Sequence, residues 1–369
     1  MNKRVVILNS RQELQPVGGD EWIINTGQAV EDSAGKGHTI LTSVGMNSWE
    51  ITLFFASKYR ARQTIFIPWD VRDTPDGVKR GLITQFHLEG APIEWRLIGT
   101  SSRKSSHQKF QSERDRLIIN EADVVVPVAV RPGGNLESLL NDARARGAVI
   151  DYAYLATTSA ARRTCRIRID PEFMNPDLDC LLRDYLIHWT RSCHGPWPGE
   201  TIYQWYDALT SSATRNPRSA LDTLVRVLLE KKLRSSDRHY RRGVPAVSFS
   251  GLPPSQAVDL MKWRARYREM TFEPYGIAVR RDMARQVGIR KVFYGSPEMY
   301  PYLEEENRPY FQSIGIKGYW MPEREYRHIG DLDLSLIPSD ALAVIVWKGD
   351  DIQAVRGIFN GRVVTVYRH

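Results

Sequence analysis

Apolar runs that read as buried strands alternate with helix-like runs through the first 155 residues. The nearly continuous apolar run from Asp123 to Val130 leads into a glycine turn and then a helical run from Leu136 to Arg146. The segment from His38 to Pro68 has the same order, with a strand, a small-residue loop, an amphipathic helix and a second strand. Strands that are apolar throughout are typical of parallel sheets covered by helices on both faces. We therefore predict an α/β, Rossmann-like N-terminal domain with a parallel sheet.

The second half of the chain has a different pattern. Asn216 and Pro217 suit the start of a helix, and leucine and valine follow at helical spacing up to Leu229. The run from Trp263 to Arg268 suits another helix. Short strand patterns then dominate, at 244–250, 275–279, 291–294, 323–334, 341–347 and 363–367. The pattern predicts an α+β C-terminal domain of short strands and helices, with domains at 1–170 and 171–369.

Two loops of the first half point to anion binding. Gly133, Gly134 and Asn135 form the turn between a buried strand and a helix, and Ser43 and Gly45 occupy the earlier loop. Free N–H groups and the helix dipole at such a turn favour a phosphate. Many purely structural strand–helix turns also contain glycine, so the turn alone leaves both interpretations open.

With these loops, and with Arg114 and Arg116 in a helical run, residues 1–155 resemble the SLOG superfamily of DprA-type DNA-processing proteins and LOG nucleotide hydrolases. The resemblance implies nucleotide binding. Only Gly45 remains of the family's early glycines, and the later turn lacks the hydrolases' threonine. We therefore expect nucleotide sensing or a scaffold rather than hydrolysis. The implied nucleotide-binding residues are Ser43, Gly45, Arg116, Gly133, Gly134 and Asn135.

Three polar elements of the second half occur in a suggestive order. His188 and Thr190 come first, the Ser248–Ser250 strand pattern follows, and Glu323, Glu325 and Arg327 come last. This order resembles ADP-ribosyltransferase-like domains. Over residues 215–345 the chain is also similar to AbiGi-type phage-resistance proteins, which share a Tyr-Gly-Ile-Ala strand (here at 275–278) and a late Glu-x-Glu segment.

The transferase resemblance implies NAD as a cofactor. It implies catalytic roles for Glu325, His188 and Glu323, and NAD-binding roles for Thr190, Ser248 and Ser250. Strand periodicity places the two glutamates on one face with Arg327, where a carboxylate can stabilise positive charge on a ribose. We expect one cleft to receive His188, Ser250 and Glu325 together. The alternatives are an exposed ion-pair strand for 323–327 and a helix for 184–191.

Composition adds few constraints. The formal charge of +8 and the pI of about 9.3 permit a nucleic-acid partner, although the arginines are scattered. Cys165, Cys180 and Cys193 are odd in number and lack metal-ligand spacing, so we predict no metal and a reduced, cytoplasmic setting. No apolar run reaches the roughly 20 residues of a membrane span, so we expect no membrane partner.

Two functions fit these patterns. In the first, a bacterial defence or conflict-system protein senses a nucleotide with its SLOG-like domain, which controls an NAD-using ADP-ribosyltransferase-like effector. In the alternative, the protein is not catalytic and binds nucleic acid in phage defence or DNA processing.

Overall fold

The computed structural model divides into two compact units, and the chain passes between them three times. The first unit holds Met1–Arg163 and His194–Pro217, and the second holds Thr164–Cys193 and Arg218–His369. A single boundary at residue 170 is therefore too simple, because the segment 194–217 returns to the first unit. The structure describes residues 2–12, 16–69, 74–99, 107–156, 169–236, 244–264, 269–314 and 324–368.

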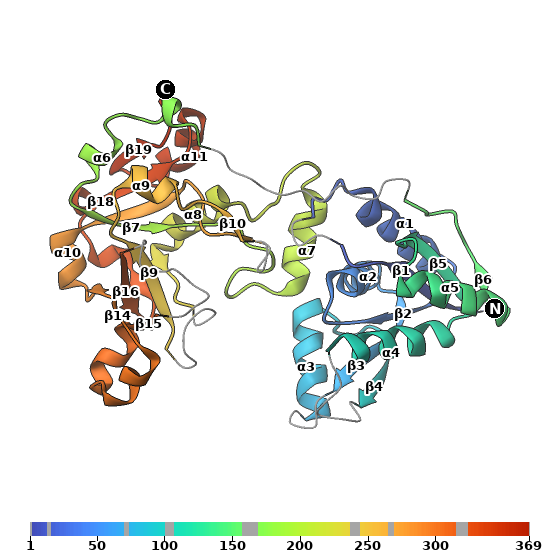
Figure 1. Ribbon diagram of the computed structural model, residues 1–369. Coiled ribbons are helices and arrows are strands. Elements are labelled where there is room, and N and C mark those ends of the chain that lie inside the picture. Colours follow the sequence, from blue (N-terminus) through green and yellow to red (C-terminus); the bar gives the residue numbers. More distant parts are fainter. Residues whose placement is uncertain are drawn as a thin grey trace. The chain divides into compact units, whose positions relative to one another are not determined.

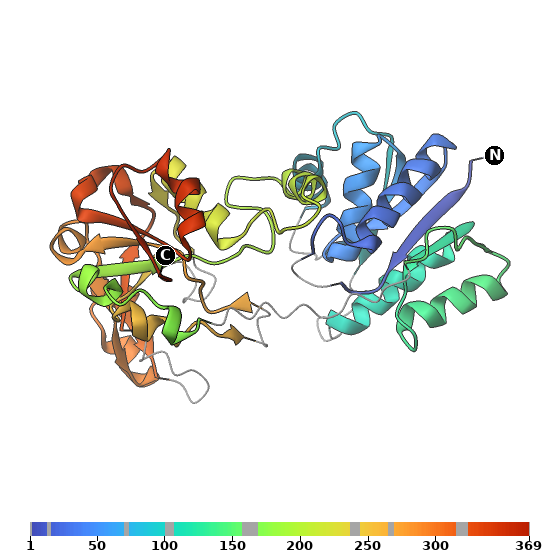
Figure 2. The ribbon, with the colours of Figure 1, turned by 90° about the horizontal axis from the view of Figure 1, so that it is seen from above.

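The first unit contains the predicted parallel sheet. Its six strands lie in the order β4-β3-β2-β1-β5-β6, and every neighbouring pair is parallel. Helices cover both faces, as Figures 1 and 2 show. The strands are β1 (Arg4–Asn9), β2 (Thr39–Ser43), β3 (Arg62–Trp69), β4 (Ile93–Gly99), β5 (Val124–Ala129) and β6 (Val149–Ile150). The helices are α1 (Glu21–Gly35), α2 (Asn47–Lys58), α3 (Pro75–Phe86), α4 (His107–Asn120), α5 (Asn135–Ala145) and α7 (Ile202–Ser211).

Side-chain alternation along β1 explains the two layers. Val5 and Ile7 pack with α1, α2 and α7, whereas Val6 and Leu8 pack with α4 and α5 on the other face. Both faces of the strand are buried, which accounts for its unbroken apolar sequence. Helix α4 begins at His107, and residues 100–106 lie outside the described part.

The second unit is a mixed α+β domain, as predicted. Its main sheet has the order β13-β16-β9-β7-β12-β18-β19, in which only β18 and β19 are parallel neighbours among the described strands. Three described strand pairs stand apart from it, β10–β11, β14–β15 and β17–β8.

The main-sheet strands are β7 (Tyr185–Trp189), β9 (Ala246–Ser250), β12 (Gly276–Arg280), β13 (Arg290–Lys291), β16 (Glu325–Ile329), β18 (Leu342–Val346) and β19 (Arg362–Thr365). The short paired strands are β8 (Lys232–Leu233), β10 (Trp263–Arg264), β11 (Glu269–Met270), β14 (Phe293–Gly295), β15 (Phe311–Ser313) and β17 (Leu332–Asp333). The helices are α6 (Leu178–Leu181), α8 (Ala220–Glu230), α9 (Pro254–Val258), α10 (Arg281–Gln286) and α11 (Ile352–Arg356).

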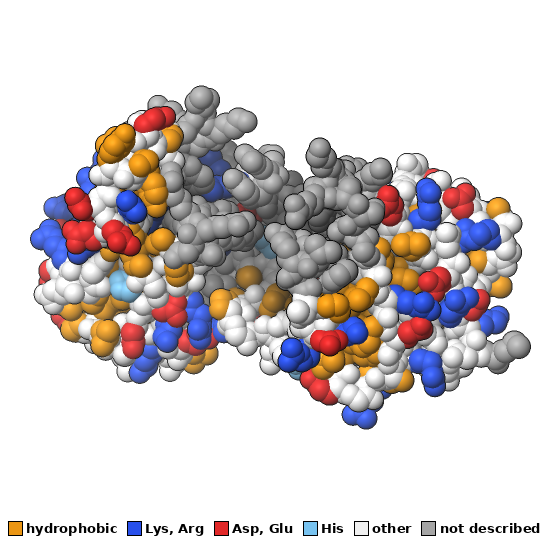
Figure 3. All heavy atoms as spheres, turned by 90° about the horizontal axis from the view of Figure 1, so that it is seen from below, with side chains coloured by type: hydrophobic (Ala, Val, Ile, Leu, Met, Phe, Trp, Pro, Cys, Tyr) orange, Lys and Arg blue, Asp and Glu red, His pale blue; other side chains and the backbone are white. Residues whose placement is uncertain are grey.

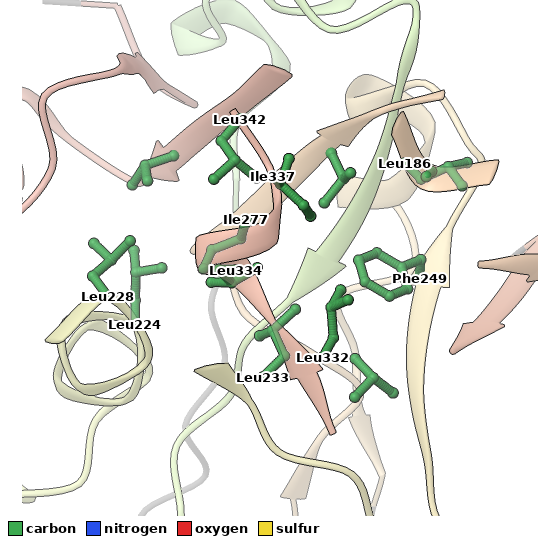
Figure 4. Packing of buried hydrophobic residues seen from close by; sticks show 14 of the residues in the cluster. Leu186, Leu224, Leu228, Leu233, Phe249, Ile277, Leu332, Leu334, Ile337 and Leu342 are labelled. Atoms are coloured by element: carbon green, nitrogen blue, oxygen red, sulfur yellow. The ribbon is translucent and has the colours of Figure 1, made fainter. Parts of the chain in front are cut away.

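One face of this sheet packs against α8. Leu224 and Leu228 of the helix point toward sheet residues that include Phe249 and Ile277 (Figure 4). The helix begins later than predicted, because Ser219 rather than Asn216 caps it: the Ser219 hydroxyl accepts a bond from the Asp222 N–H at 3.1 Å. The opposite face packs against α6 and α9.

Two further expectations concern the local structure of short segments. Residues 185–189 form a strand, so the helical alternative for 184–191 is wrong. Trp263 and Arg264 form a short strand where a helix was predicted, and 265–268 lie outside the described residues.

Candidate functional site

The carboxyl edge of the six-stranded sheet is the place where its topology favours a ligand. From β1 the chain continues to β2 on one side, and β5 lies on the other side of β1. Helix α1, which follows β1, covers one face, while α5, which follows β5, covers the other. Ligands of open α/β sheets bind at such a switch point, where the loops diverge. The loops after β1, β2 and β5 are therefore the candidate site.

The loop after β2 holds Ser43 and Gly45, and both have their donors engaged within the protein. The Ser43 side chain is fully buried and its hydroxyl donates to the Phe66 carbonyl at 2.7 Å. The Gly45 N–H donates to Glu50 Oε1 at 3.0 Å. Neither group is available to a ligand in this arrangement.

Glu50 is a largely buried carboxyl group of α2. Burial raises its pKa, and the bonds from the Gly45 N–H and the Tyr206 hydroxyl (3.3 Å) counteract that rise in part. Tyr206 belongs to α7 and has a pKa raised well above its ordinary value, first by burial and then by the Glu50 charge. Glu50 thus links the β2–α2 loop to α7.

The turn after β5 confirms the predicted strand–turn–helix geometry. Gly133 has φ +70°, a conformation that glycine adopts without strain. Its N–H donates to Glu137 Oε2 at 2.7 Å, and the Gly134 N–H reaches the Arg131 carbonyl at 3.2 Å. Asn135 is exposed at the first position of α5. The glycine N–H groups are thus internally bonded instead of facing a pocket as expected.

Arg114, rather than Arg116, reaches the early loop from α4. Arg116 is exposed, whereas Arg114 is 2% exposed and donates from Nη1 to the Val44 carbonyl at 3.1 Å. Its Nε and Nη2 atoms bond Asp115 Oδ1 at 3.1 and 2.9 Å. The Trp49 indole donates to the same oxygen at 3.2 Å. Helical spacing from the apolar Ile118 and Ile119 is the sequence signal that could have placed Arg114 on the inner face instead of Arg116.

The loop after β1 contains a glycine pair that the sequence pattern left unnoticed. The Gly18 N–H donates to the Ser212 carbonyl at 3.1 Å, and the Gly19 N–H donates to the Ala213 carbonyl at 2.9 Å. These carbonyls follow the end of α7. The end of α7 therefore engages the N–H donors that a glycine-rich loop can otherwise offer to a phosphate.

Among the described residues of the β1–α1 and β5–α5 loops, Arg11 and Arg131 are exposed. The Ser10 N–H donates to the Ala129 carbonyl at 2.7 Å, and the Arg131 N–H donates to Ser10 Oγ at 2.8 Å. These bonds hold the β1–α1 and β5–α5 loops together. Exposed Arg11 leaves the first loop and donates to Gln111 Oε1 at 3.3 Å. Exposed Arg131 leaves the second loop and forms no ion pair in the described part of the chain.

In the second unit, Glu325 sits in a buried ion pair rather than an open cleft. Its Oε1 accepts bonds from Arg327 Nε and Ser248 Oγ, both at 2.9 Å, and its Oε2 accepts from Arg327 Nη2 at 3.0 Å. The two side chains are 11% and 4% exposed. Arg327 also donates to the Pro309 carbonyl at 3.0 Å and to Gln312 Oε1 at 2.7 Å. The pair therefore fixes the 309–312 segment to the sheet, and the exposed ion-pair alternative is wrong.

His188 lies on the opposite face of the same sheet. Glu325 and Arg327 pair with Ser250 and Ser248, so these four side chains share one face. His188 instead packs its ring against Phe249, with centroids 5.8 Å apart, on the face covered by α8. Its Nδ1 lies 2.8 Å from the Ser248 carbonyl oxygen. Burial lowers the pKa of His188, and so favours the neutral ring.

The structure therefore does not bring the expected NAD-binding residues together. Thr190 is buried, with its hydroxyl 3.0 Å from the Ala220 carbonyl at the start of α8. The Ser250 hydroxyl accepts a bond from the Leu252 N–H at 3.3 Å. A sheet separates His188 from Glu325, so no single NAD molecule contacts both in this fold. Glu323 lies outside the described residues.

Neither a metal centre nor a membrane span is found in the described part of the chain. No group of three or more histidine, cysteine, aspartate or glutamate side chains suited to a metal occurs among the described residues. Cys180 is exposed and Cys193 is half-buried, and neither belongs to a disulfide among the described residues; Cys165 lies outside the described part. Within the described helices, none has the length and apolar character needed to cross a bilayer. On the face shown in Figure 3, described basic and acidic side chains are interspersed.

Comparisons with known proteins give only distant structural likeness. No family model matches the chain, and no curated protein matches it. DNA processing protein A from Helicobacter pylori, described by its single-stranded DNA binding mode, matches 40% of this chain and 63% of its own, at 14% identity and a TM-score of 0.30. DNA processing protein A from Streptococcus pneumoniae matches 40% of this chain and 49% of its own, at 12% identity and a TM-score of 0.30. The molybdenum cofactor carrier protein of Chlamydomonas reinhardtii matches 41% of this chain and 75% of its own, at 10% identity and a TM-score of 0.27.

Proposed function

We propose that this chain binds nucleic acid, and that the carboxyl edge of the six-stranded sheet contacts phosphates through Arg11 and Arg131. The observation that carries the proposal is the Ser10–Arg131 hydrogen bond, which fixes the two arginine-bearing loops side by side at the switch point. Arginine side chains supply much of the contact to a phosphate backbone. The formal charge of +8 agrees with a polyanionic partner.

Nucleic acid fits this edge better than a small nucleotide held by backbone N–H groups. The N–H groups of Gly18, Gly45 and Gly133 are all bonded to atoms of the protein. A pyrophosphate cradle depends on such donors being free. Outward arginines on a solvent-facing edge need no cradle, because they contact the backbone of a strand that passes across them.

The test measures binding of a fluorescent single-stranded DNA oligonucleotide to the full chain by anisotropy over a salt series. We expect affinity to fall steeply with salt, because each neutralised phosphate releases counterions. Replacing both Arg11 and Arg131 by glutamine should weaken binding uniformly across sequences. It should also lower the slope of log K against log salt by about 0.7 for each phosphate of the single strand that the variant no longer neutralises.

Arg62→Gln is the matched control, because Arg62 is exposed on the same sheet at its opposite, amino edge. Equal weakening of binding in the control and the double variant would remove the carboxyl edge as the interface. Absence of wild-type binding to single- and double-stranded DNA and RNA at low salt would contradict the proposed function.

A further inference from the structure

The second unit has a basic hollow at the carboxyl ends of its one described pair of parallel main-sheet strands. The hollow has a volume of about 460 Å³. Strand β18 continues through η7 (Gly349–Asp351) and α11 to the parallel strand β19, so this part of the sheet is a small βαβ unit. The side chains that matter in its lining are Lys348, Asp350, Gln353, Arg356, Tyr367 and Arg368.

The strand pairing explains why the cations converge. The Val366 N–H donates to the Val346 carbonyl, and the Tyr367 N–H to the Trp347 carbonyl, both at 2.9 Å. The ladder thus continues past both strands and brings Lys348 and Arg368 to the same edge. Arg356, in the last turn of α11, supplies the third cation. Ligands of parallel sheets bind at this edge.

The three cations are available to a ligand. Lys348 Nζ lies 4.8 Å from the centroid of the Trp347 ring, and neither Lys348 nor Arg356 forms an ion pair in the described part of the chain. Arg368 donates from Nε to the Met174 carbonyl at 3.1 Å, which orients its guanidinium and leaves the terminal nitrogens. Asp350 is the one carboxylate among the described lining residues. Positive charge therefore dominates the hollow.

An aromatic ring forms part of the wall. Tyr367 packs at an angle against Trp347, with centroids 5.9 Å apart, and its hydroxyl accepts a bond from the Asp170 N–H at 3.1 Å. These contacts hold the half-buried ring in place, with part of it lining the hollow. A fixed aromatic ring beside cations suits a ligand that has both a planar group and phosphates.

We propose that this hollow binds a nucleoside phosphate, with Lys348, Arg356 and Arg368 on the phosphates and Tyr367 against the base. The volume falls in the range of small-molecule sites, roughly 300–1,000 Å³. Bidentate arginine contacts and a lysine point charge are the usual partners of phosphate oxygens. This site lies in a different unit from the DNA-binding edge and does not depend on it.

Isothermal titration of the full chain with ATP, and separately with inorganic triphosphate, tests the proposal at low ionic strength. Inorganic triphosphate has the same number of phosphates as ATP but no nucleoside. We expect Arg356→Gln and Lys348→Gln each to weaken ATP binding about 10–100-fold, the usual effect of removing a charge-assisted hydrogen bond. Asp350→Asn should strengthen binding, because it removes the repelling carboxylate. Arg285→Gln is the control, since Arg285 is exposed on α10, away from the lining residues.

The outcomes separate the parts of the proposal. Weaker binding of inorganic triphosphate than of ATP supports nucleoside contact at Tyr367, whereas equal affinity overturns that contact. No heat signal with either ligand overturns the site. The site is also overturned if Arg356→Gln and Lys348→Gln bind ATP with the same affinity as the control Arg285→Gln.

Discussion

At the scale of single residues, the buried Glu325–Arg327 pair shows how an apparently catalytic motif serves structure. The Glu325 carboxylate accepts hydrogen bonds from Arg327 and Ser248, and Arg327 continues to the 309–312 segment. The Glu325 carboxylate orients Arg327, and Arg327 holds the 309–312 segment against the sheet. A buried pair adds little net stability relative to apolar residues, yet removal of one partner leaves an uncompensated charge.

Glu325→Gln should therefore lower the stability of the full chain. Arg327 keeps its buried charge without its counterion, and breaking a buried pair costs roughly 3–5 kcal/mol. Differential scanning calorimetry should show one unfolding transition shifted to lower temperature. The double replacement Glu325→Leu with Arg327→Met should cost less than Glu325→Gln alone. Exposed Glu304→Gln serves as the control, and a shift in Glu304→Gln as large as in Glu325→Gln would contradict the structural role.

The sequence predicted that Glu325 and Arg327 lie on one face of a strand, but it did not predict which side chains surround them. Period-two alternation correctly placed Glu325 and Arg327 on one face. Alternation within one strand does not determine which side chains of the neighbouring strand lie on the same face of the sheet. A shift of one residue in the register between the strands moves those side chains to the other face. Ile187 pairs with Ser250, and this register turns His188 away from Glu325. Such pairing joins segments that are far apart in the chain, so local sequence patterns cannot predict it.

At the scale of elements, local patterns located several strands and helices, missed others such as α7, and misplaced some ends. Strands β5, β9 and β18 lie within the predicted apolar runs, and β12 ends one residue beyond its run. Helix α5 begins at the predicted turn. The start of α8 was misplaced because Asn216-Pro217 and Ser219 are both acceptable start signals. The structure uses Ser219 with Asp222 in a reciprocal capping box.

Ser219→Ala should destabilise the second unit by about 1 kcal/mol, the usual cost of removing a helix N-cap. The Asp222 N–H would lose its acceptor at the start of the helix whose leucines cover the sheet. Urea unfolding followed by circular dichroism measures the change. Ser339→Ala provides the comparison, since Ser339 is exposed. Unchanged stability of Ser219→Ala would show that the cap is dispensable.

At the scale of the whole molecule, the returning segment 194–217 completes the first unit. Trp205, Tyr206 and Leu209 of α7 are buried in the core formed with α1 and α2. A Cβ atom at Gly18 would lie 2.2 Å from the Leu209 carbonyl oxygen and 2.9 Å from that of Ser212. Glycine is therefore required there by close contact with α7. The sequence offered no signal for this contact, because about 190 residues separate the partners.

Gly18→Ala should displace α7 and lower the unfolding temperature of the first unit. The backbone carbonyl cannot move without breaking the packing that surrounds it. Gly81→Ala is the matched control: nothing lies within 4 Å of the added Cβ in α3, so alanine should raise stability by roughly 0.5–1 kcal/mol. Thermal unfolding by circular dichroism compares the two. Equal melting temperatures would contradict the tight contact.

The contact between α7 and the Gly18-Gly19 loop also sets an order of events during protein synthesis. Domains commonly fold as units while the chain emerges, at roughly 5–20 residues per second. Here the sheet strands β1–β6 leave the ribosome first, but the apolar surface that α7 covers stays open until residue 211 has emerged. Residues 164–193 of the second unit are made in that interval. The first unit is thus finished only after the second has begun, and the growing chain has an exposed apolar face in the meantime.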